Sequence, residues 1–95
     1  MLSLAATLGS KNIRVNGIAP GFAGTKGTQL FYDRYPKIRA DIEEKCHLKP
    51  SFMHPGAIIP AVLYLLTDNY VTGLTIPLDG GYHIDLKQYF QDLPQ

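Results

Sequence analysis

Residues 13–19 read Ile-Arg-Val-Asn-Gly-Ile-Ala, and the class of fold follows from this run. Apart from two polar positions, its members are branched and apolar or small, which is typical of a strand buried on both faces. Such strands belong to parallel sheets that helices cover on both sides. Pro20 and Gly21 end the run, because proline cannot donate a hydrogen bond to a ladder. We therefore expect an α/β protein.

The residues before and after this strand have helical patterns. Residues 1–9 indicate the last turns of a helix that Gly9 stops. A glycine-rich loop follows at residues 21–29, and residues 30–46 are expected to be helical in pieces, with a break at Pro36. After that break, Ile38, Ile42 and Cys46 recur at every fourth position and form a thin apolar stripe.

A second helix and a second strand complete the pattern. Residues 58–66 (Ile58–Leu66) carry a wide apolar face that ends near Asp68, and we place the helix start near Ala57 so that Pro60 falls in the first turn. Leu74–Leu78 is the second predicted strand, and a turn at residues 79–81 ends it. The tail at residues 82–95 is too aromatic for a plain solvated tail.

The order of these elements predicts one β–α–β crossover between parallel strands. Two parallel strands do not make an independently stable sheet, so the first strand calls for further neighbours and covering helices. The first helix also has no capping residue before it. We expect the missing elements to lie upstream in a longer protein, or to come from partner chains. Residues 1–95 then form one portion of a single domain.

Composition narrows the classes of function. A chain of 95 residues that is 45% hydrophobic and 18% charged is globular rather than disordered. The net charge of +1 without a basic stripe makes nucleic acids and acidic membranes poor partners. The apolar N-terminal run is too short to span a bilayer and has no charged leader. With a single cysteine, Cys46, a cytoplasmic protein is expected.

Two longer runs resemble the short-chain dehydrogenase/reductase family. Residues 4–25, LAATLGSKNIRVNGIAPGFAGT, are similar to the helix, strand and loop that follow the active site in that family. Residues 61–82, AVLYLLTDNYVTGLTIPLDGGY, are similar to its last helix and last strand. The resemblance implies the C-terminal part of a Rossmann-like doubly wound parallel sheet. It also implies a substrate loop or lid within residues 26–50.

The resemblance assigns a cofactor loop to the end of the first strand. Pro20 and Gly21 match the family's Pro-Gly pair beside the nicotinamide of NAD or NADP, where glycine lets the backbone approach a flat ring. Ala23 stands where an aliphatic residue pairs its backbone with the carboxamide, Thr25 matches a threonine that bonds the cofactor, and Phe22 could lie along the ring or the substrate. The alternative is a tight turn without a ligand.

The catalytic motif of the family is not in this sequence. A tyrosine followed four residues later by lysine does not occur, since Tyr35, Tyr64 and Tyr70 are followed by Arg39, Asp68 and Leu74. A glycine-rich pyrophosphate fingerprint is absent too, because the glycines of residues 17–24 have the wrong spacing. No catalytic residue is therefore assigned, and the resemblance puts the proton donor and its lysine upstream of Met1.

The remaining aromatic, histidine and cysteine residues can also be explained without a functional role. Phe31, Tyr32 and Tyr35 either pack a short helix onto the body or form a lid that closes over the substrate. Cys46 and His47 are adjacent and point apart on a helix, so they are a poor ligand pair. No metal site is expected.

The leading hypothesis is a segment of an oxidoreductase that moves a hydride between NAD or NADP and a small carbonyl or alcohol. The alternative is a truncated, non-catalytic binding or assembly module derived from the same family. In both cases the Ile58–Leu66 helix and the Leu74–Leu78 strand are candidates for a homo-oligomer interface. The uncovered edge of the sheet predicts self-association of the isolated chain.

Overall fold

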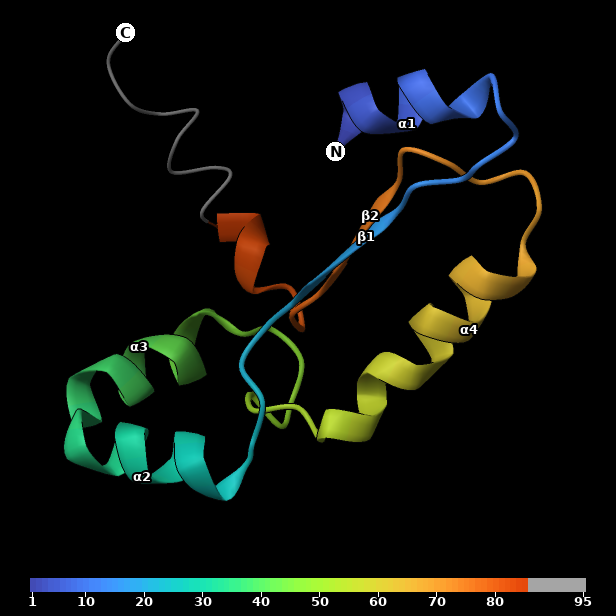
Figure 1. Ribbon diagram of the computed structural model, residues 1–95. Helices are drawn as coiled ribbons and strands as arrows, with labels where there is room; N and C mark the ends of the chain where they lie inside the picture. Colours follow the sequence, from blue (N-terminus) through green and yellow to red (C-terminus); the bar gives the residue numbers. More distant parts are fainter. Residues whose placement is uncertain (86–95) are drawn as a thin grey trace, which may run out of the picture.

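Figure 1 shows the computed structural model, which describes residues 1–85. Its elements run in the order α1 (Leu2–Gly9), β1 (Gly17–Pro20), α2 (Lys26–Arg34), α3 (Pro36–Lys45), η1 (Pro55–Ile58), α4 (Ile59–Thr67) and β2 (Thr75–Leu78). The two strands lie side by side at the centre, α2 and α3 lie at the carboxyl end of β1, and α1 lies at the opposite end. Leu86, Tyr89 and Phe90 of the aromatic tail lie outside the described residues.

The sheet is parallel, as the order of the elements predicts. Gly17 pairs with Thr75 and Pro20 pairs with Leu78, so the two strands are in register over four residues. The second strand begins at Thr75, one residue later than expected, and ends at Leu78 as expected. The described chain is therefore of the α/β class, with one crossover between parallel strands.

The first strand, Gly17–Pro20, is shorter than residues 13–19 predict, and it includes Pro20, which was expected to end it. Before Gly17 the two segments are joined by one backbone bond, from the Gly73 N–H to the Val15 carbonyl at 2.8 Å, and by side-chain bonds. The Val15 N–H donates to the Thr72 hydroxyl at 3.1 Å. The Asn16 amide donates to the Val71 carbonyl at 3.0 Å, and its oxygen accepts from the Leu74 N–H at 3.0 Å. Regular strand pairing begins at Gly17, opposite Thr75. Within the described residues the strand is not buried, since Gly17 and Ile18 are half-buried and Ala19 and Pro20 are exposed. This agrees with the expectation that the chain by itself supplies too few covering elements.

Helix α2 begins at Lys26, inside the stretch that was expected to be a loop. Thr25 and Thr28 form a capping box, which starts a helix despite the nearby glycines. Pro36 separates α2 from α3, as predicted, and stands in the first turn of α3. On α3 the apolar stripe is only partly buried: Ile42 and Cys46 are buried, and Ile38 is exposed.

Helix α4 has a different start and a different environment from those expected. A 3-10 turn, Pro55–Ile58, precedes it, and α4 begins at Ile59 with Pro60 in its first turn. The face that was expected to be core is not core here, since α4 contains no buried residue and Leu66 is 67% exposed. The reason is architectural, because the described chain provides only two strands for this helix to cover.

Little of the chain is buried. The buried apolar residues are Ala5, Tyr32, Ile42 and Cys46, and three of these belong to the α2–α3 region. The radius of gyration is 16.4 Å, whereas a compact domain of this length has one of about 12–13 Å. The arrangement is thus open, and its best-packed part is the α2–α3 pair with the segment that follows it.

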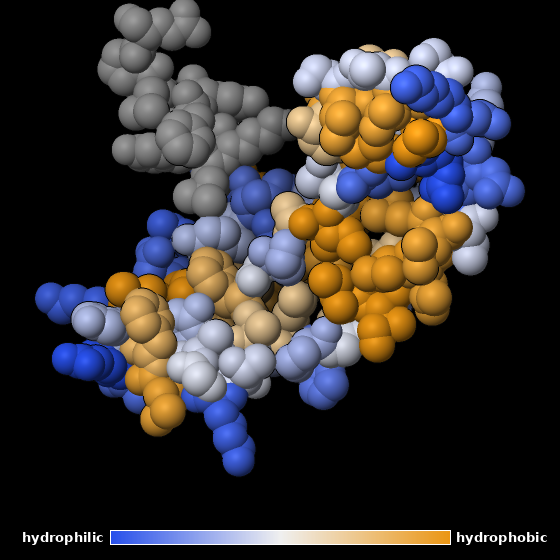
Figure 2. Space-filling view, viewed as in Figure 1, coloured by the Kyte–Doolittle hydropathy of each residue, from blue (hydrophilic) through white to orange (hydrophobic). Residues whose placement is uncertain are grey.

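Figure 2 shows where apolar side chains reach the surface: they gather over α1 and over α4. The exposed apolar residues of these two helices include Leu2 and Leu4 of α1 and Ile59, Leu63 and Leu66 of α4. Apolar side chains that gather on an exposed surface are characteristic of interaction sites.

Candidate functional site

The carboxyl ends of β1 and β2 lie together and fix where the two following loops start. The Gly21 N–H donates to the Leu78 carbonyl at 2.8 Å, directly after the last paired residues. A Cβ atom on Gly21 would lie 2.7 Å from the Asp79 Cα, which no side chain tolerates. Glycine is thus required here by the approach of the neighbouring strand end. The sequence offered a different reason, approach to a ring.

The loop after β1 runs alongside residues 52–53. The Met53 N–H donates to the Phe22 carbonyl at 2.8 Å, and the Gly24 N–H donates to the Met53 carbonyl at 2.8 Å. Ala23 therefore forms a parallel bridge with Met53, and its own N–H and carbonyl face the other side. The Ala23 carbonyl accepts from the Thr28 hydroxyl at 2.6 Å. Its N–H makes no hydrogen bond to any of residues 1–85.

Thr25 ends the loop and caps α2. Its hydroxyl accepts from the Thr28 N–H at 3.3 Å, and its own N–H donates to the Thr28 hydroxyl at 2.9 Å. The residue is exposed, so the hydroxyl is within reach of solvent as well as of the helix. Thr25 thus also has a structural role, as the N-cap of α2, besides the cofactor contact that the resemblance implies.

The three predicted lid residues have two different environments. Tyr32 is only 7% exposed and packs against Phe22 and Phe52, with ring centroids 6.3 Å and 4.8 Å away. Phe31 and Tyr35 contact each other at 4.9 Å and are both exposed. Tyr32 thus packs inside the α2–α3 region, while Phe31 near the end of α2 and Tyr35 at the junction with α3 form an exposed aromatic pair.

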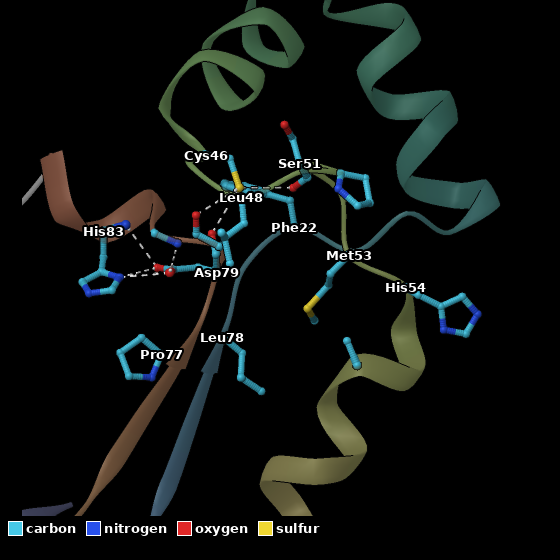
Figure 3. A pocket seen from close by; sticks show the side chains of 14 residues that line it. Phe22, Cys46, Leu48, Ser51, Met53, His54, Pro77, Leu78, Asp79 and His83 are labelled. Carbon is cyan, nitrogen blue, oxygen red and sulfur yellow. Dashed lines mark hydrogen bonds and ion pairs between the residues drawn. The ribbon is translucent and has the colours of Figure 1, made fainter.

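A cavity of about 500 Å³ opens at the end of β2, and Figure 3 shows the side chains around it. Residues between 46 and 57 form one wall, residues 77–81 with His83 form the other, and Phe22 contributes from the loop after β1. We call it the β2-end cavity. Of the predicted cofactor loop, only Phe22 reaches it. The sequence signal for the opposite wall is the Asp-Gly-Gly turn at residues 79–81, which by itself indicates only the end of a strand.

The side chains of Asp79 and His83 are hydrogen-bonded to each other at the rim of the cavity. Both carboxylate oxygens of Asp79 lie 2.9 Å from Nδ1 of His83, and the Gly81 and His83 N–H groups donate to the same carboxylate at 3.1 and 3.2 Å. Burial raises the pKa of Asp79, but the His83 ring and these backbone donors outweigh it. The net pKa of Asp79 lies below its ordinary value.

Cys46 connects the cavity wall to the turn after β2. Its thiol is 3% exposed and donates to the Asp79 carbonyl with a sulfur–oxygen distance of 3.3 Å. Gly80 has φ +61°, and a Cβ atom there would lie 2.7 Å from the Cys46 sulfur. The adjacent His47 points elsewhere and pairs with Asp85 at 3.1 Å. Among residues 1–85, no group of three or more histidine, cysteine or acidic side chains is placed to hold a metal ion.

Within the part of the chain that the structure describes, none of the helices combines the length and apolarity needed to cross a bilayer.

Comparisons with known proteins agree on one class of enzyme. The family model described as enoyl-(acyl carrier protein) reductase matches residues 1–83. Carbonyl reductase family member 4 of Xenopus laevis is 34% identical over 88% of this chain, and D-arabinitol 2-dehydrogenase [ribulose-forming] of Candida tropicalis is 32% identical over 84%. L-xylulose reductase of Caenorhabditis elegans is 38% identical over 83% of this chain.

These matches cover only part of each relative. The aligned regions are 33%, 29% and 32% of the lengths of these three proteins. The chain thus spans about one third of the length of the curated relatives that it matches. No solved structure matches the chain.

Proposed function

Because this chain belongs to the short-chain dehydrogenase/reductase family, we propose that it forms the nicotinamide-facing part of an NAD- or NADP-dependent oxidoreductase. The resemblance in the sequence is confirmed by the family model over residues 1–83 and by relatives that are reductases and dehydrogenases. The parent enzyme would move a hydride between the cofactor and a carbonyl or alcohol. This chain would be the C-terminal third of its doubly wound sheet.

The position of the loop at residues 20–25 is the observation that carries this proposal. The loop starts where two parallel strands end, which is where open α/β sheets bind their ligands. The Ala23 N–H is a donor that the described residues leave unused, and it suits the carboxamide oxygen of a nicotinamide. The Thr25 hydroxyl is exposed two residues later and offers a second polar group.

The residues of this chain would bind and orient the cofactor but would not move the proton. When bound, the nicotinamide supplies or accepts the hydride. Phe22 lies between the loop and the β2-end cavity, and its ring contacts Tyr82 at 5.1 Å. It would help to exclude water on that side. The 95-residue sequence has no Tyr-x-x-x-Lys, so the proton donor of the parent enzyme would come from another segment.

Amide chemical shifts test the cofactor site directly. Isotope-labelled chain is titrated with reduced nicotinamide mononucleotide, which carries the ring without the adenosine half. The largest shifts are expected at the Ala23 and Thr25 amides. Ala23→Pro removes the donor and should weaken binding by about tenfold, the equivalent of one hydrogen bond. Ala23→Val keeps the donor and is the matched control. Shifts confined to other regions, or equal binding by the two variants, would contradict the proposal.

We also propose that the parent assembles as a homo-oligomer through α4 and β2. The exposure of Ile59, Leu63 and Leu66 on one short helix supports an interface there. Leu63→Glu should shift sedimentation of the chain toward monomer, because a charge would have to be buried at the interface. Leu30→Glu makes the same change at an exposed residue of α2 and should leave the mass unchanged.

A further inference from the structure

We propose that the β2-end cavity takes an uncharged ligand with an apolar body, of the class of alkyl or alicyclic ketones and alcohols. The inference deepens the proposed function and relies on it for the carbonyl or alcohol group. The nature of the ligand body follows from the walls of the cavity alone.

The walls present mostly carbon to an occupant. Leu48, Met53, Pro77 and Leu78 line the cavity together with the ring of Phe22. They come from three separate segments that converge at the end of β2, as Figure 3 shows. An apolar lining with few polar groups is the usual composition of a small-molecule site, and a volume of about 500 Å³ is within the usual range of about 300–1,000 Å³.

The polar side chains of the walls are few, and each of three already has a partner within the chain. The Ser51 hydroxyl accepts from the Lys49 ammonium at 2.9 Å, and Nδ1 of His54 accepts from the Gly56 N–H at 3.0 Å. Asp79 is satisfied by His83 and two backbone N–H groups. The Ser51 hydroxyl proton and the second ring nitrogens of His54 and His83 are the polar side-chain groups that these bonds leave to a ligand. A ligand with many hydroxyl groups would therefore leave most of its own hydroxyls without partners, and each unpaired buried group is costly.

The charges around the cavity also select against anionic ligands. No lysine or arginine is among the residues that line it in the described part of the chain. Asp79, the one carboxylate of the walls, already pairs with His83 at 2.9 Å. A phosphate or carboxylate placed here would meet the Asp79 carboxylate, while Lys49 does not line the cavity and contacts the wall through the Ser51 hydroxyl at 2.9 Å. Desolvation of such an anion would be compensated poorly by the lining residues.

The cavity borders the proposed cofactor loop. Phe22 belongs to both, and Met53 is the bridge partner of Ala23 while its side chain lines the cavity. A ligand whose apolar body occupies the cavity would thus have its polar end nearest to residues 22–23. This geometry assigns Met53 the role of a specificity-determining residue.

Ligand-observed nuclear magnetic resonance on the 95-residue chain tests the inference. The probes are camphor, a bicyclic ketone, and D-ribulose, a sugar ketone. Camphor is expected to bind at least about tenfold more tightly than ribulose. Equal or tighter binding of ribulose, or no binding of camphor, would overturn the inference.

Two variants test the location. Met53→Gln keeps the length of the side chain and adds an amide, so camphor should bind several-fold more weakly, whereas Met53→Leu should bind it normally. Leu30→Gln makes a comparable polar change away from the cavity and should have no effect. Ala57→Phe, which adds a bulky ring at a residue that lines the cavity, should also weaken camphor binding.

The cofactor titration separates this inference from the proposed function. Camphor binding that responds to Met53→Gln supports the cavity whether or not nicotinamide mononucleotide shifts the Ala23 amide. Camphor binding that is indifferent to both Met53→Gln and Ala57→Phe would refute it even if the cofactor binds as proposed.

Discussion

Gly21→Ala provides a sharp test of how the strand ends are joined. The added Cβ would lie 2.7 Å from the Asp79 Cα and 2.9 Å from its Cβ. The nearest of these atoms is backbone, so the contact cannot be relieved by a rotamer change. The two strand ends must move apart, which also stretches the 2.8 Å bond from the Gly21 N–H to the Leu78 carbonyl.

The expected loss of unfolding free energy is about 1–3 kcal/mol, the usual cost of overpacking. Gly21 does not have a positive φ, so backbone strain is not part of this cost. For a chain of this length, each kcal/mol corresponds to a fall in Tm of about 4–8 °C. Such a loss is a large part of the stability of any small domain.

Urea denaturation followed by far-ultraviolet circular dichroism measures the effect. The midpoint is compared at two protein concentrations, so that self-association does not mask the change. Gly27→Ala is the matched control: no atom lies within 4 Å of the Cβ that it adds, and the residue is helical. It should raise stability by up to about 1 kcal/mol. If the two variants have the same urea midpoint, Asp79 does not lie as close to Gly21 as the structure indicates.

Two further substitutions probe the α2–α3 region and the turn after β2. Ile42→Ala should lower the free energy of unfolding by about 2–5 kcal/mol, because Ile42 is 2% exposed. Ile38→Ala, on the exposed side of the same helix, should cost far less. Equal urea midpoints for the two variants would contradict the packing of α3. Asp79 has a lowered pKa in the folded chain, so its contribution to stability is present above its ordinary pKa and is lost as the pH falls through that value and below. Asp79→Asn should therefore reduce the fall in unfolding free energy between about pH 5 and pH 2. An unchanged fall would show that the hydrogen bond between Asp79 and His83 does not stabilise the fold.

The sequence predicted helices and strands well where a local signal marks them. Pro36 separates two helices and Pro60 falls in a first turn, as the missing N–H of proline requires. The start of α2 was missed because its signal, the Thr25–Thr28 capping box, lies within a run of glycines that favours a loop.

The cavity could not be predicted from the same signals. Its walls come from the loop after β1, from residues 46–57 and from residues 77–83, which are far apart in the sequence. No motif joins Met53 to Ala23 or Cys46 to Asp79. These contacts depend on how the loops leave the two strands, and Gly21 and Gly80 are the positions where a side chain would prevent them.

The sequence by itself determined the α/β class, the parallel pairing and the family, because local patterns of apolar and turn residues carry that information. Only the tertiary structure decided that Gly21 accommodates Asp79, that Thr25 caps a helix, that Tyr32 is core while Phe31 and Tyr35 are exposed, and that an apolar cavity lies beside the loop. The physical reason is that burial and contact depend on which surfaces meet in space, and residues distant in the chain set that together.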